Sequence, residues 1–172
     1  GIVPTSSTIS QLSIGDALAV AILNKKKISK TDFKKYHPSG NLGIKLRTVE
    51  ELMSVGNKIP FVSENLNMEK ALKILTQKKL GTLIVRNKNR ITTGIITDGN
   101  IRRLNQKTDN LKKFIVKSVM TKNPIYVEKE MLAEKALSIM NDQKITCVCV
   151  NKNKNKTIGI LHIHNILDTK IR

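Results

Sequence analysis

The sequence predicts an α+β fold in which two copies of one β-α-β unit pack in a pseudo-twofold arrangement, preceded by an α-helical segment outside the repeat. The first observation is an ungapped internal repeat, which relates residues 67–101 to residues 132–166 at an offset of 65. The second is that apolar residues in each copy recur first at helical and then at strand spacing. The third is that the first 48 residues share neither feature.

The repeat aligns similar residues along its whole length. The matches include Ala71 with Ala136, Ile74 with Ile139, Gly94 with Gly159, and Asn100–Ile101 with Asn165–Ile166. Ahead of it, Leu52 and Met53 resemble Val119 and Met120 at an offset of 67, and both methionines are expected to be core residues. A lone copy would leave one face of its sheet exposed, so the duplication predicts two units that pack together.

Each copy is predicted to form a helix, a strand, a turn, a second strand and a second helix. In the first copy the helix and strands cover Met68–Leu75, Thr82–Val85 and Thr93–Ile96, with a turn at Asn87–Asn89. Thr97 and Asp98 then offer side-chain oxygens to the free N–H groups of the following helix. The second copy repeats the order through Ala133–Asn141, Thr146–Val150, Lys152–Lys156, Thr157–Leu161 and His164–Thr169.

The N-terminal segment has a different character. A hydroxyl-rich stretch, Pro4–Thr8, leads into a long helix over Ile9–Leu23 that is apolar on nearly all sides. Such a helix is normally buried by more protein than 48 residues supply. We therefore expect the segment to be the end of a domain whose beginning is absent. Its apolar surface should be covered by another chain or left exposed. A turn-rich loop with one histidine, His37, follows.

Composition narrows the function classes. A chain of 172 residues with 40% hydrophobic residues suggests one domain or two small ones and excludes wholesale disorder. No apolar run approaches the roughly 20 residues that span a bilayer, and no signal segment opens the chain, so no membrane partner is expected. Cys147 and Cys149 lie in a predicted strand and are interpreted as packing residues. A reduced, cytoplasmic protein is the simplest interpretation.

The net charge of +18 raises the possibility of a nucleic-acid partner. Against it, the lysines are spread over most of the chain, and aromatic residues make up only 3%, which leaves no platform for stacking bases. A solvated basic surface is the favoured interpretation, with no nucleic-acid partner. His162 and His164 have no cysteine or acid placed to complete a metal site, so no metal and no cofactor are expected.

Two groups of motifs together resemble a known family. Pro4–Thr8, Gly15–Val20 and His37–Gly43 resemble the closing part of a sugar isomerase (SIS) domain. Gly94–Arg103 and Gly159–Leu167 resemble the two CBS units that follow it. In this order the chain is similar to the D-arabinose 5-phosphate isomerase family over essentially its whole length. The resemblance implies an SIS remnant at 1–48 and CBS domains at 49–108 and 109–172.

The resemblance implies an aldose–ketose isomerase that interconverts D-ribulose 5-phosphate and D-arabinose 5-phosphate in Kdo and lipopolysaccharide biosynthesis, as a homo-oligomer. His37 matches the active-site histidine of the family; the alternative is a loop histidine that hydrogen-bonds a turn. Thr5, Ser6, Ser7 and Thr8 could face the sugar phosphate, with helix capping as the alternative. The catalytic base would lie upstream of Gly1, so the chain is expected to be inactive by itself.

The resemblance also implies a regulatory ligand site in each CBS unit. The candidate residues are Thr97, Asp98, Asn100, Arg102 and Arg103 in the first unit and His162, His164 and Asn165 in the second. Many CBS units place a Thr or Ser and, three residues later, an Asp on the ribose of an adenosine nucleotide. Asparagine stands at that later position in both units here, so adenine nucleotides should bind weakly.

The two arginines favour an anionic ligand, with plain surface solvation as the alternative. The pathway of the family suggests an effector similar to CMP-Kdo. Two further functions compete with a regulatory portion of the isomerase: a stand-alone CBS-pair nucleotide sensor for another partner, and a basic nucleic-acid-binding module. The segment from Pro4 to Gly43 favours the isomerase, because a free sensor has no need of a helix suited to burial.

Overall fold

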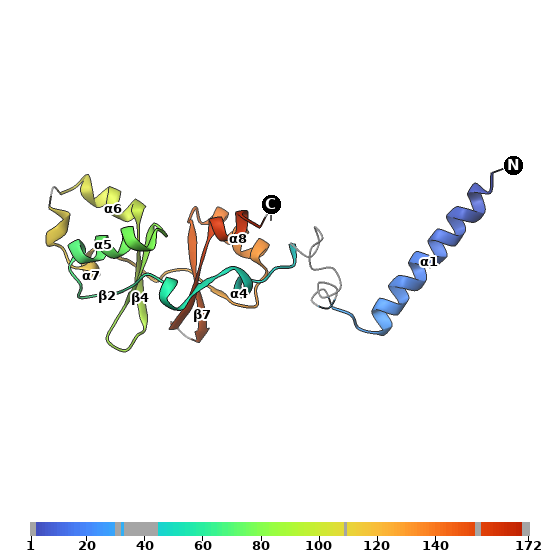
Figure 1. Ribbon diagram of the computed structural model, residues 1–172, viewed down its shortest axis with the longest axis horizontal. Helices are drawn as coiled ribbons and strands as arrows, with labels where there is room; N and C mark the ends of the chain where they lie inside the picture. The colour runs from blue at the N-terminus through green and yellow to red at the C-terminus, as the bar shows by residue number, and fades with distance from the viewer. Residues whose placement is uncertain (1–2, 30–31, 33–44, 109, 154–155, 170–172) are drawn as a thin grey trace. The chain divides into compact units, whose positions relative to one another are not determined.

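The computed structural model describes residues 3–29, 32, 45–108, 110–153 and 156–169 (Figure 1). It divides into two compact units, Gly1–Leu46 and Arg47–Arg172. The first unit contains helix α1 (Thr5–Lys25). The second contains, in chain order, α4 (Val49–Leu52), β1 (Ser54–Val55), the 3-10 helix η1 (Gly56–Lys58), β2 (Phe61–Ser63), α5 (Met68–Lys78), β3 (Thr82–Arg86), β4 (Thr92–Thr97), α6 (Asp98–Asn105), the 3-10 helix η2 (Leu111–Lys113), α7 (Val116–Val119), β5 (Thr121–Lys122), β6 (Tyr126–Glu128), α8 (Ala133–Asp142), β7 (Cys147–Asn153), β8 (Lys156–His162) and α9 (Ile163–Leu167).

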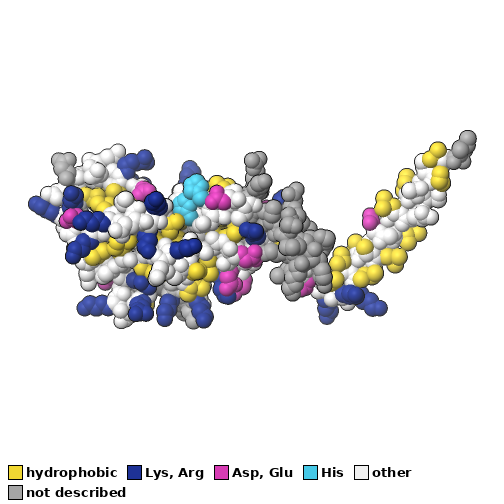
Figure 2. Space-filling model, in the orientation of Figure 1, with side chains coloured by type: hydrophobic (Ala, Val, Ile, Leu, Met, Phe, Trp, Pro, Cys, Tyr) yellow, Lys and Arg dark blue, Asp and Glu magenta, His cyan; other side chains and the backbone are white. Residues whose placement is uncertain are grey.

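Helix α1 confirms the predicted helix and extends it at both ends. None of its residues is buried, and large apolar side chains such as Ile9, Leu12 and Leu18 are more than half exposed. Figure 2 shows apolar side chains along its whole visible length. An uncovered apolar helix is one of the two outcomes that the sequence predicts for this segment. The hydrophobic clusters described in the second unit consist of residues of that unit.

The length of α1 corrects one statement from the sequence. Among the described helices, Thr5–Lys25 is long and apolar enough to cross a membrane by length and composition, with a mean hydropathy of 1.3. The expectation that no segment approaches spanning length is therefore wrong. Length and hydropathy are weak evidence for a membrane span, because a helix from the core of a water-soluble domain has the same properties.

The second unit contains two four-stranded sheets, with strand orders β2-β3-β4-β5 and β1-β8-β7-β6. In each sheet a parallel pair precedes an antiparallel hairpin. Phe61 pairs with Ile84 in the first sheet, and Tyr126 pairs with Cys149 in the second, at the same offset of 65. Helices α5 and α6 lie against the first sheet and α8 and α9 against the second (Figure 1). The predicted duplication is confirmed. Several boundaries differ by one to three residues. The largest differences are that α5 and β7 extend to Lys78 and Asn153, which shortens the second predicted turn, and that α9 ends at Leu167.

Each sheet takes its fourth strand from the segment that precedes the other copy. Strand β1 comes before the first copy but pairs with β8, with Ser54 opposite Ile160. Strand β5 comes before the second copy but pairs with β4, with Thr121 opposite Ile95. The sequence ranges 49–108 and 109–172 follow the repeat, whereas each sheet combines strands from both ranges. The alignment of the repeat did not reveal this exchange.

Each exchanged strand lies in a short segment, 49–55 for β1 and 116–122 for β5, and we call these the exchanged segments. Their positions also explain the packing of the two methionines. Met120 lies over Gly94, where an added Cβ would come within 2.6 Å of the methionine sulfur, and Met53 lies equally close over Gly159. Both methionines are half-buried. A side chain at either glycine would push the exchanged segment away from the sheet, so these two glycines permit the close approach. The expectation of core packing therefore holds in part, at the sheet edge.

The two sheets face each other across an apolar cluster of Ile59, Ile84, Cys147, Cys149 and Ile160. At one end of this interface the Thr92 and Thr157 hydroxyl oxygens lie 2.8 Å apart in a buried hydrogen bond. These residues are equivalents in the repeat, and a residue that contacts its own equivalent lies on the twofold axis. The predicted pseudo-twofold arrangement is thereby confirmed. Both cysteines are free and buried, as expected of packing residues.

Candidate functional site

The Thr97 turn, which we define as Thr97–Asn100, joins the end of β4 to the start of α6. The Thr97 backbone N–H and hydroxyl both donate to the Asn100 Oδ1, at 3.0 and 2.7 Å. The Asn100 N–H donates in return to the Thr97 hydroxyl oxygen at 3.3 Å. This is a reciprocal capping box, which satisfies backbone donors at the helix start. The Thr97 and Asn100 side chains, which the sequence assigns to a ligand, therefore hydrogen-bond to each other in the ligand-free chain.

Asn100 has a further partner from the exchanged segment. Its Nδ2 donates to the Thr121 hydroxyl oxygen in β5 at 2.9 Å. The amide thus joins the start of α6 to a strand that precedes the second copy. No spacing in the sequence predicts this contact, because it depends on the pairing of β5 with β4.

The His162 turn, His162–Asn165, is the equivalent junction between β8 and α9. The His162 N–H donates to the Asn165 Oδ1 at 3.0 Å, and the His164 N–H donates to the His162 Nδ1 at 3.3 Å. An accepting Nδ1 requires the neutral imidazole with its proton on Nε2. Burial, and next the nearby His164, lower the pKa of His162 and favour this form. The ring centroids lie 5.0 Å apart (cyan in Figure 2).

The remaining candidate residues of the first copy are exposed. The Asp98 N–H donates to the Gly81 carbonyl at 3.0 Å, and the Asp98 carboxylate covers that glycine, where an added Cβ would come within 2.7 Å of it. Gly81 has a φ of +59°, so both its backbone and the contact disfavour a side chain. Arg102 and Arg103 are exposed on α6, one turn beyond the Thr97 turn. They place cationic groups in solvent in the last turn of the helix.

The pseudo-twofold axis places the two turns at the same end of the sheets. Thr82 pairs with Thr97 and Cys147 pairs with His162, and the Thr82 side chain lies close enough to the Cys147 thiol to affect its pKa. The Thr92–Thr157 contact lies at the opposite end of the same strands. The structure therefore brings both predicted ligand segments to one end of the second unit.

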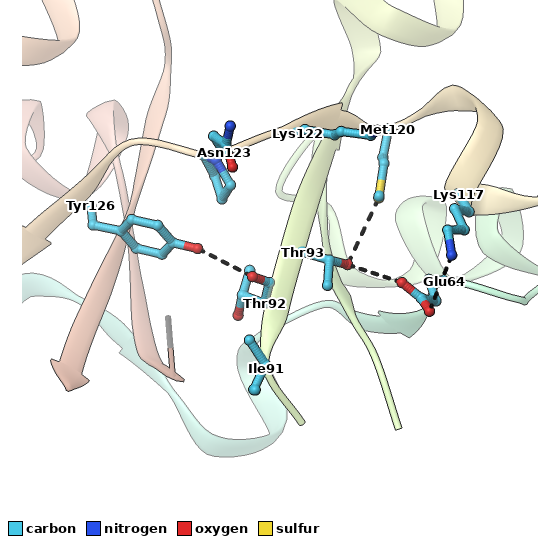
Figure 3. A pocket seen from close by; sticks show the side chains of 10 residues that line it. Glu64, Ile91, Thr92, Thr93, Lys117, Met120, Lys122, Asn123 and Tyr126 are labelled. Carbon is cyan, nitrogen blue, oxygen red and sulfur yellow. Dashed lines mark hydrogen bonds and ion pairs between the residues drawn. The ribbon is translucent and has the colours of Figure 1, made fainter. Parts of the chain in front are cut away.

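A cavity of about 550 Å³ lies at the other end, where β4 begins (Figure 3). Its lining residues are Glu64, Ile91, Thr92, Thr93, Lys117, Met120, Lys122, Asn123, Pro124 and Tyr126. None of the residues predicted to bind a ligand is among them. Many of its polar groups already contact each other, as the Tyr126 hydroxyl does at 3.5 Å from the Thr92 carbonyl. Burial, and next the nearby Cys149, raise the pKa of Tyr126 to about 12.

The N-terminal candidates are less informative. His37 and the loop around it lie outside the described residues. Thr5, Ser6, Ser7 and Thr8 form the exposed first turn of α1, where the Ser7 and Thr8 hydroxyls donate to the Pro4 carbonyl at 3.0 and 2.8 Å. No side chain caps the helix start, so the capping alternative is not what the hydroxyls do here. Within the described ranges no three His, Cys, Asp or Glu residues cluster as metal ligands.

Comparison with known proteins identifies the second unit. Residues 49–107 and 116–171 each match the CBS domain family. The chain belongs to the CBS domain family. The two sheets with their exchanged strands are thus the two halves of a CBS pair, and the Thr97 and His162 turns are its equivalent helix starts.

Similarity to curated proteins extends beyond the CBS pair. The chain is 39% identical over 170 residues to the arabinose 5-phosphate isomerase KdsD of Francisella tularensis and 38% identical over 168 residues to that of Escherichia coli K12. These matches cover 98% and 97% of the chain but only 52% and 51% of the relatives. An uncharacterized protein of Rickettsia prowazekii is 38% identical over 164 residues. The chain spans about half the length of the curated relatives it matches.

Solved structures with a similar fold include CBS-domain proteins. CBSX2 in complex with AMP is 25% identical, with a TM-score of 0.63, and the match covers 72% of this chain and 96% of that one. A CBS-domain protein of Agrobacterium tumefaciens has a TM-score of 0.66 at 19% identity, over 73% of this chain and 95% of that one, and supports the fold alone. Both matches cover a share of the chain similar to that of the second unit.

Proposed function

We propose that the chain is the regulatory CBS-pair portion of an aldose–ketose isomerase that interconverts D-ribulose 5-phosphate and D-arabinose 5-phosphate. The observation that carries the proposal is the extent of the similarity to the KdsD isomerases, which includes α1 as well as the CBS pair. Two CBS domains alone would account for residues 49–171 only. Similarity that continues through the N-terminal segment indicates a shared domain organisation.

Within this proposal, residues 1–48 are the C-terminal part of an SIS domain. Residues 49–108 and 109–172 are the two CBS domains. His37 acts in proton transfer on the sugar, and the hydroxyls of Thr5–Thr8 lie near the sugar phosphate. The reaction belongs to Kdo and lipopolysaccharide biosynthesis in the cytoplasm. A homo-oligomer is supported by the exposed apolar side chains of α1, since a large apolar surface usually has a partner.

We assign the CBS pair an anionic nucleotide or nucleotide-sugar as effector, bound at the Thr97 and His162 turns. The positive end of a helix favours an anion even where side chains cap some of its N–H groups, and Arg102 and Arg103 add positive charge in the last turn of α6. The AMP complex of CBSX2 supports a nucleotide as the ligand class. Because the Asn100 and Asn165 oxygens cap their own helices, AMP and ATP should bind more weakly than in CBS pairs that have an aspartate at this position, and the pathway of the similar isomerases suggests CMP-Kdo as the effector.

Calorimetry of the 172-residue chain with AMP, ATP and CMP-Kdo tests the effector. We expect CMP-Kdo to bind more tightly than either adenine nucleotide and to bind less tightly after Arg102→Ala. Lys88→Ala, which removes an exposed cation in the turn after β3, is the matched control and should bind normally. Tight ATP binding that survives Arg102→Ala and is lost with Asn100→Ala would contradict the assignment.

Isomerase assays on a protein that joins this chain to the other half present in its relatives test the enzymatic part. His37→Ala should lower turnover by about 10²–10⁴-fold, the usual cost of losing a proton-transfer group, while circular dichroism stays unchanged. Turnover that is near normal in this variant would reduce His37 to a structural loop residue.

A stand-alone CBS-pair nucleotide sensor is the second candidate. One observation favours it: Arg47–Arg172 forms its own compact unit, and the match to CBSX2 covers 96% of that protein. The isomerase assay separates the two candidates. Nucleotide binding by the chain without any isomerisation by the longer protein would favour the sensor.

A further inference from the structure

The Thr97 turn uses more of its polar atoms internally than the His162 turn does. The Asn100 Oδ1 accepts from the Thr97 N–H and hydroxyl, and its Nδ2 donates to the Thr121 hydroxyl. The Thr97 hydroxyl oxygen also accepts from the Asn100 N–H. An asparagine side chain offers two donors and two acceptor positions, so a single N–H of the amide remains without a partner.

The His162 turn forms the same capping box but lacks two of these contacts, the one from a hydroxyl to the asparagine oxygen and the one from the asparagine nitrogen to the neighbouring strand. The Asn165 Oδ1 accepts from the His162 N–H alone, and an imidazole replaces the threonine hydroxyl. The residue equivalent to Thr121 at the offset of 67 is Ser54, and both Asn165 and Ser54 are among the described residues. No hydrogen bond joins this described pair, so the Asn165 Nδ2 keeps its donors for another group.

We infer that the Asn100–Thr121 hydrogen bond is a latch that makes the two effector positions of the CBS pair unequal. The unequal binding of a ligand rests on the proposed function, whereas the hydrogen bond itself does not. A ligand hydroxyl at the Thr97 turn must displace the Thr121 hydroxyl or use the one remaining N–H. The net free energy of a typical hydrogen bond corresponds to a change of about two- to tenfold in Kd. The Thr97 turn therefore fills second, at about two- to tenfold higher concentration.

The latch also joins elements that come from different halves of the chain. Thr121 lies in β5, and β5 continues through three residues into β6 of the second sheet. A ligand that breaks the Asn100–Thr121 bond releases one contact that holds β5 beside α6. Occupancy of the Thr97 turn is thereby coupled to the edge of the first sheet.

The ligand-free chain provides the first test. Nuclear magnetic resonance should show slower solvent exchange of the Asn100 side-chain amide protons than of those of Asn165. Thr121→Val keeps the β-branched shape but removes the oxygen, so exchange at Asn100 should rise to the rate at Asn165. Ser54→Ala is the matched control at the equivalent position and should change neither rate. Equal exchange of the two amides in the unchanged chain would overturn the latch.

A titration with AMP provides the second test, with the backbone amides of Asn100 and Asn165 followed separately. The apparent Kd at Asn100 should exceed that at Asn165 by about two- to tenfold, and Thr121→Val should remove the difference. Ser54→Ala should leave it in place. Equal affinities in the unchanged chain, or a difference that persists in Thr121→Val, would overturn the inference. If neither AMP nor CMP-Kdo binds either turn, the proposed nucleotide function fails, and the exchange experiment alone decides the latch.

Discussion

At the residue scale, Asn100 combines roles that an aspartate in its place could not combine. Its oxygen caps α6 and its nitrogen donates to Thr121. An ionised aspartate could accept the same cap but has no donor. Asn165 caps α9 in the same way. From the sequence, both asparagines were interpreted only as weakened ribose contacts; the structure adds a helix-capping role to each.

The His162 turn predicts a pH dependence of stability. Because the folded-state pKa of His162 lies below its usual value, the unfolded chain binds a proton more readily than the folded one. The contribution of His162 to the free energy of unfolding should be fully present above the usual histidine pKa of about 6.5. It should be lost as the pH drops from there through the lowered folded-state pKa. Urea unfolding between pH 8 and pH 5 measures this. His162→Asn, which keeps a capping acceptor but does not titrate, should lose less stability, and an identical pH profile would contradict the account.

The two buried cysteines predict resistance to alkylation. Burial, and next the nearby Cys147, raise the pKa of Cys149 to about 12, and burial also raises that of Cys147. At pH 8 only about one Cys149 in ten thousand is then a thiolate. Iodoacetamide should label neither cysteine in the folded chain and both in urea, as mass spectrometry can show. Ser138→Cys, on the exposed face of α8, is the accessible control; native labelling at its rate would show that the cluster opens.

At the element scale, the exchanged segments carry charges of opposite sign. Lys117 in α7 faces Glu64 at 3.7 Å, whereas the equivalent Glu50 in α4 faces Lys129 at 2.8 Å. The backbone contacts are the same: the Lys117 N–H donates to the Glu64 carbonyl and the Glu50 N–H donates to the Lys129 carbonyl. Backbone geometry therefore does not distinguish the two segments. The ion pairs do, because they favour α7 beside the first sheet and α4 beside the second.

Reversal of one charge tests this pairing. Glu50→Lys places two cations together and should lower the urea midpoint, because an attraction becomes a repulsion. Adding Lys129→Glu should restore the midpoint, since the pair is then reversed but intact. Glu134→Lys makes the same change of net charge on the exposed face of α8 and serves as the control. Equal midpoints for Glu50→Lys and Glu134→Lys would show that the ion pair contributes nothing specific.

At the scale of the whole molecule, the described chain combines a compact CBS pair with a helix that has no buried residue. The CBS pair contains the apolar clusters of the described chain, whereas the large apolar side chains of α1 are exposed. Exposed apolar surface of this kind favours association. The N-terminal unit is therefore the part of the chain that we expect to bring copies together.

Self-association of the chain should depend on α1. The paired substitution Leu12→Glu and Leu18→Glu places charges in its apolar surface and should shift sedimentation velocity profiles towards the monomer. The far-ultraviolet circular dichroism signal of the CBS pair should persist. Lys70→Gln and Lys135→Gln, which lower the net charge by the same two units at exposed positions outside α1, control for altered net charge. An unchanged oligomer distribution in the α1 variant would locate the association elsewhere.

The sequence by itself determined the local elements and the duplication. Apolar spacing fixed the helices and hairpins, the offset of 65 fixed their equivalence, and Thr97 was correctly predicted to cap α6. These features depend on residues close together in the chain, and periodicity reports such neighbours. The motifs also identified the CBS pair, which the family match confirmed.

Only the tertiary structure decided the exchange of β1 and β5, the Asn100–Thr121 bond and the cavity beside Tyr126. Each joins residues from different halves of the chain. Because the two halves are duplicates, either edge offers a similar strand the same backbone partners. The sequence pattern does not specify which edge a strand joins. Packing of the methionines over their glycines and the ion pairs of Lys117 with Glu64 and of Glu50 with Lys129 favour the observed edges, and these contacts exist only in the folded chain.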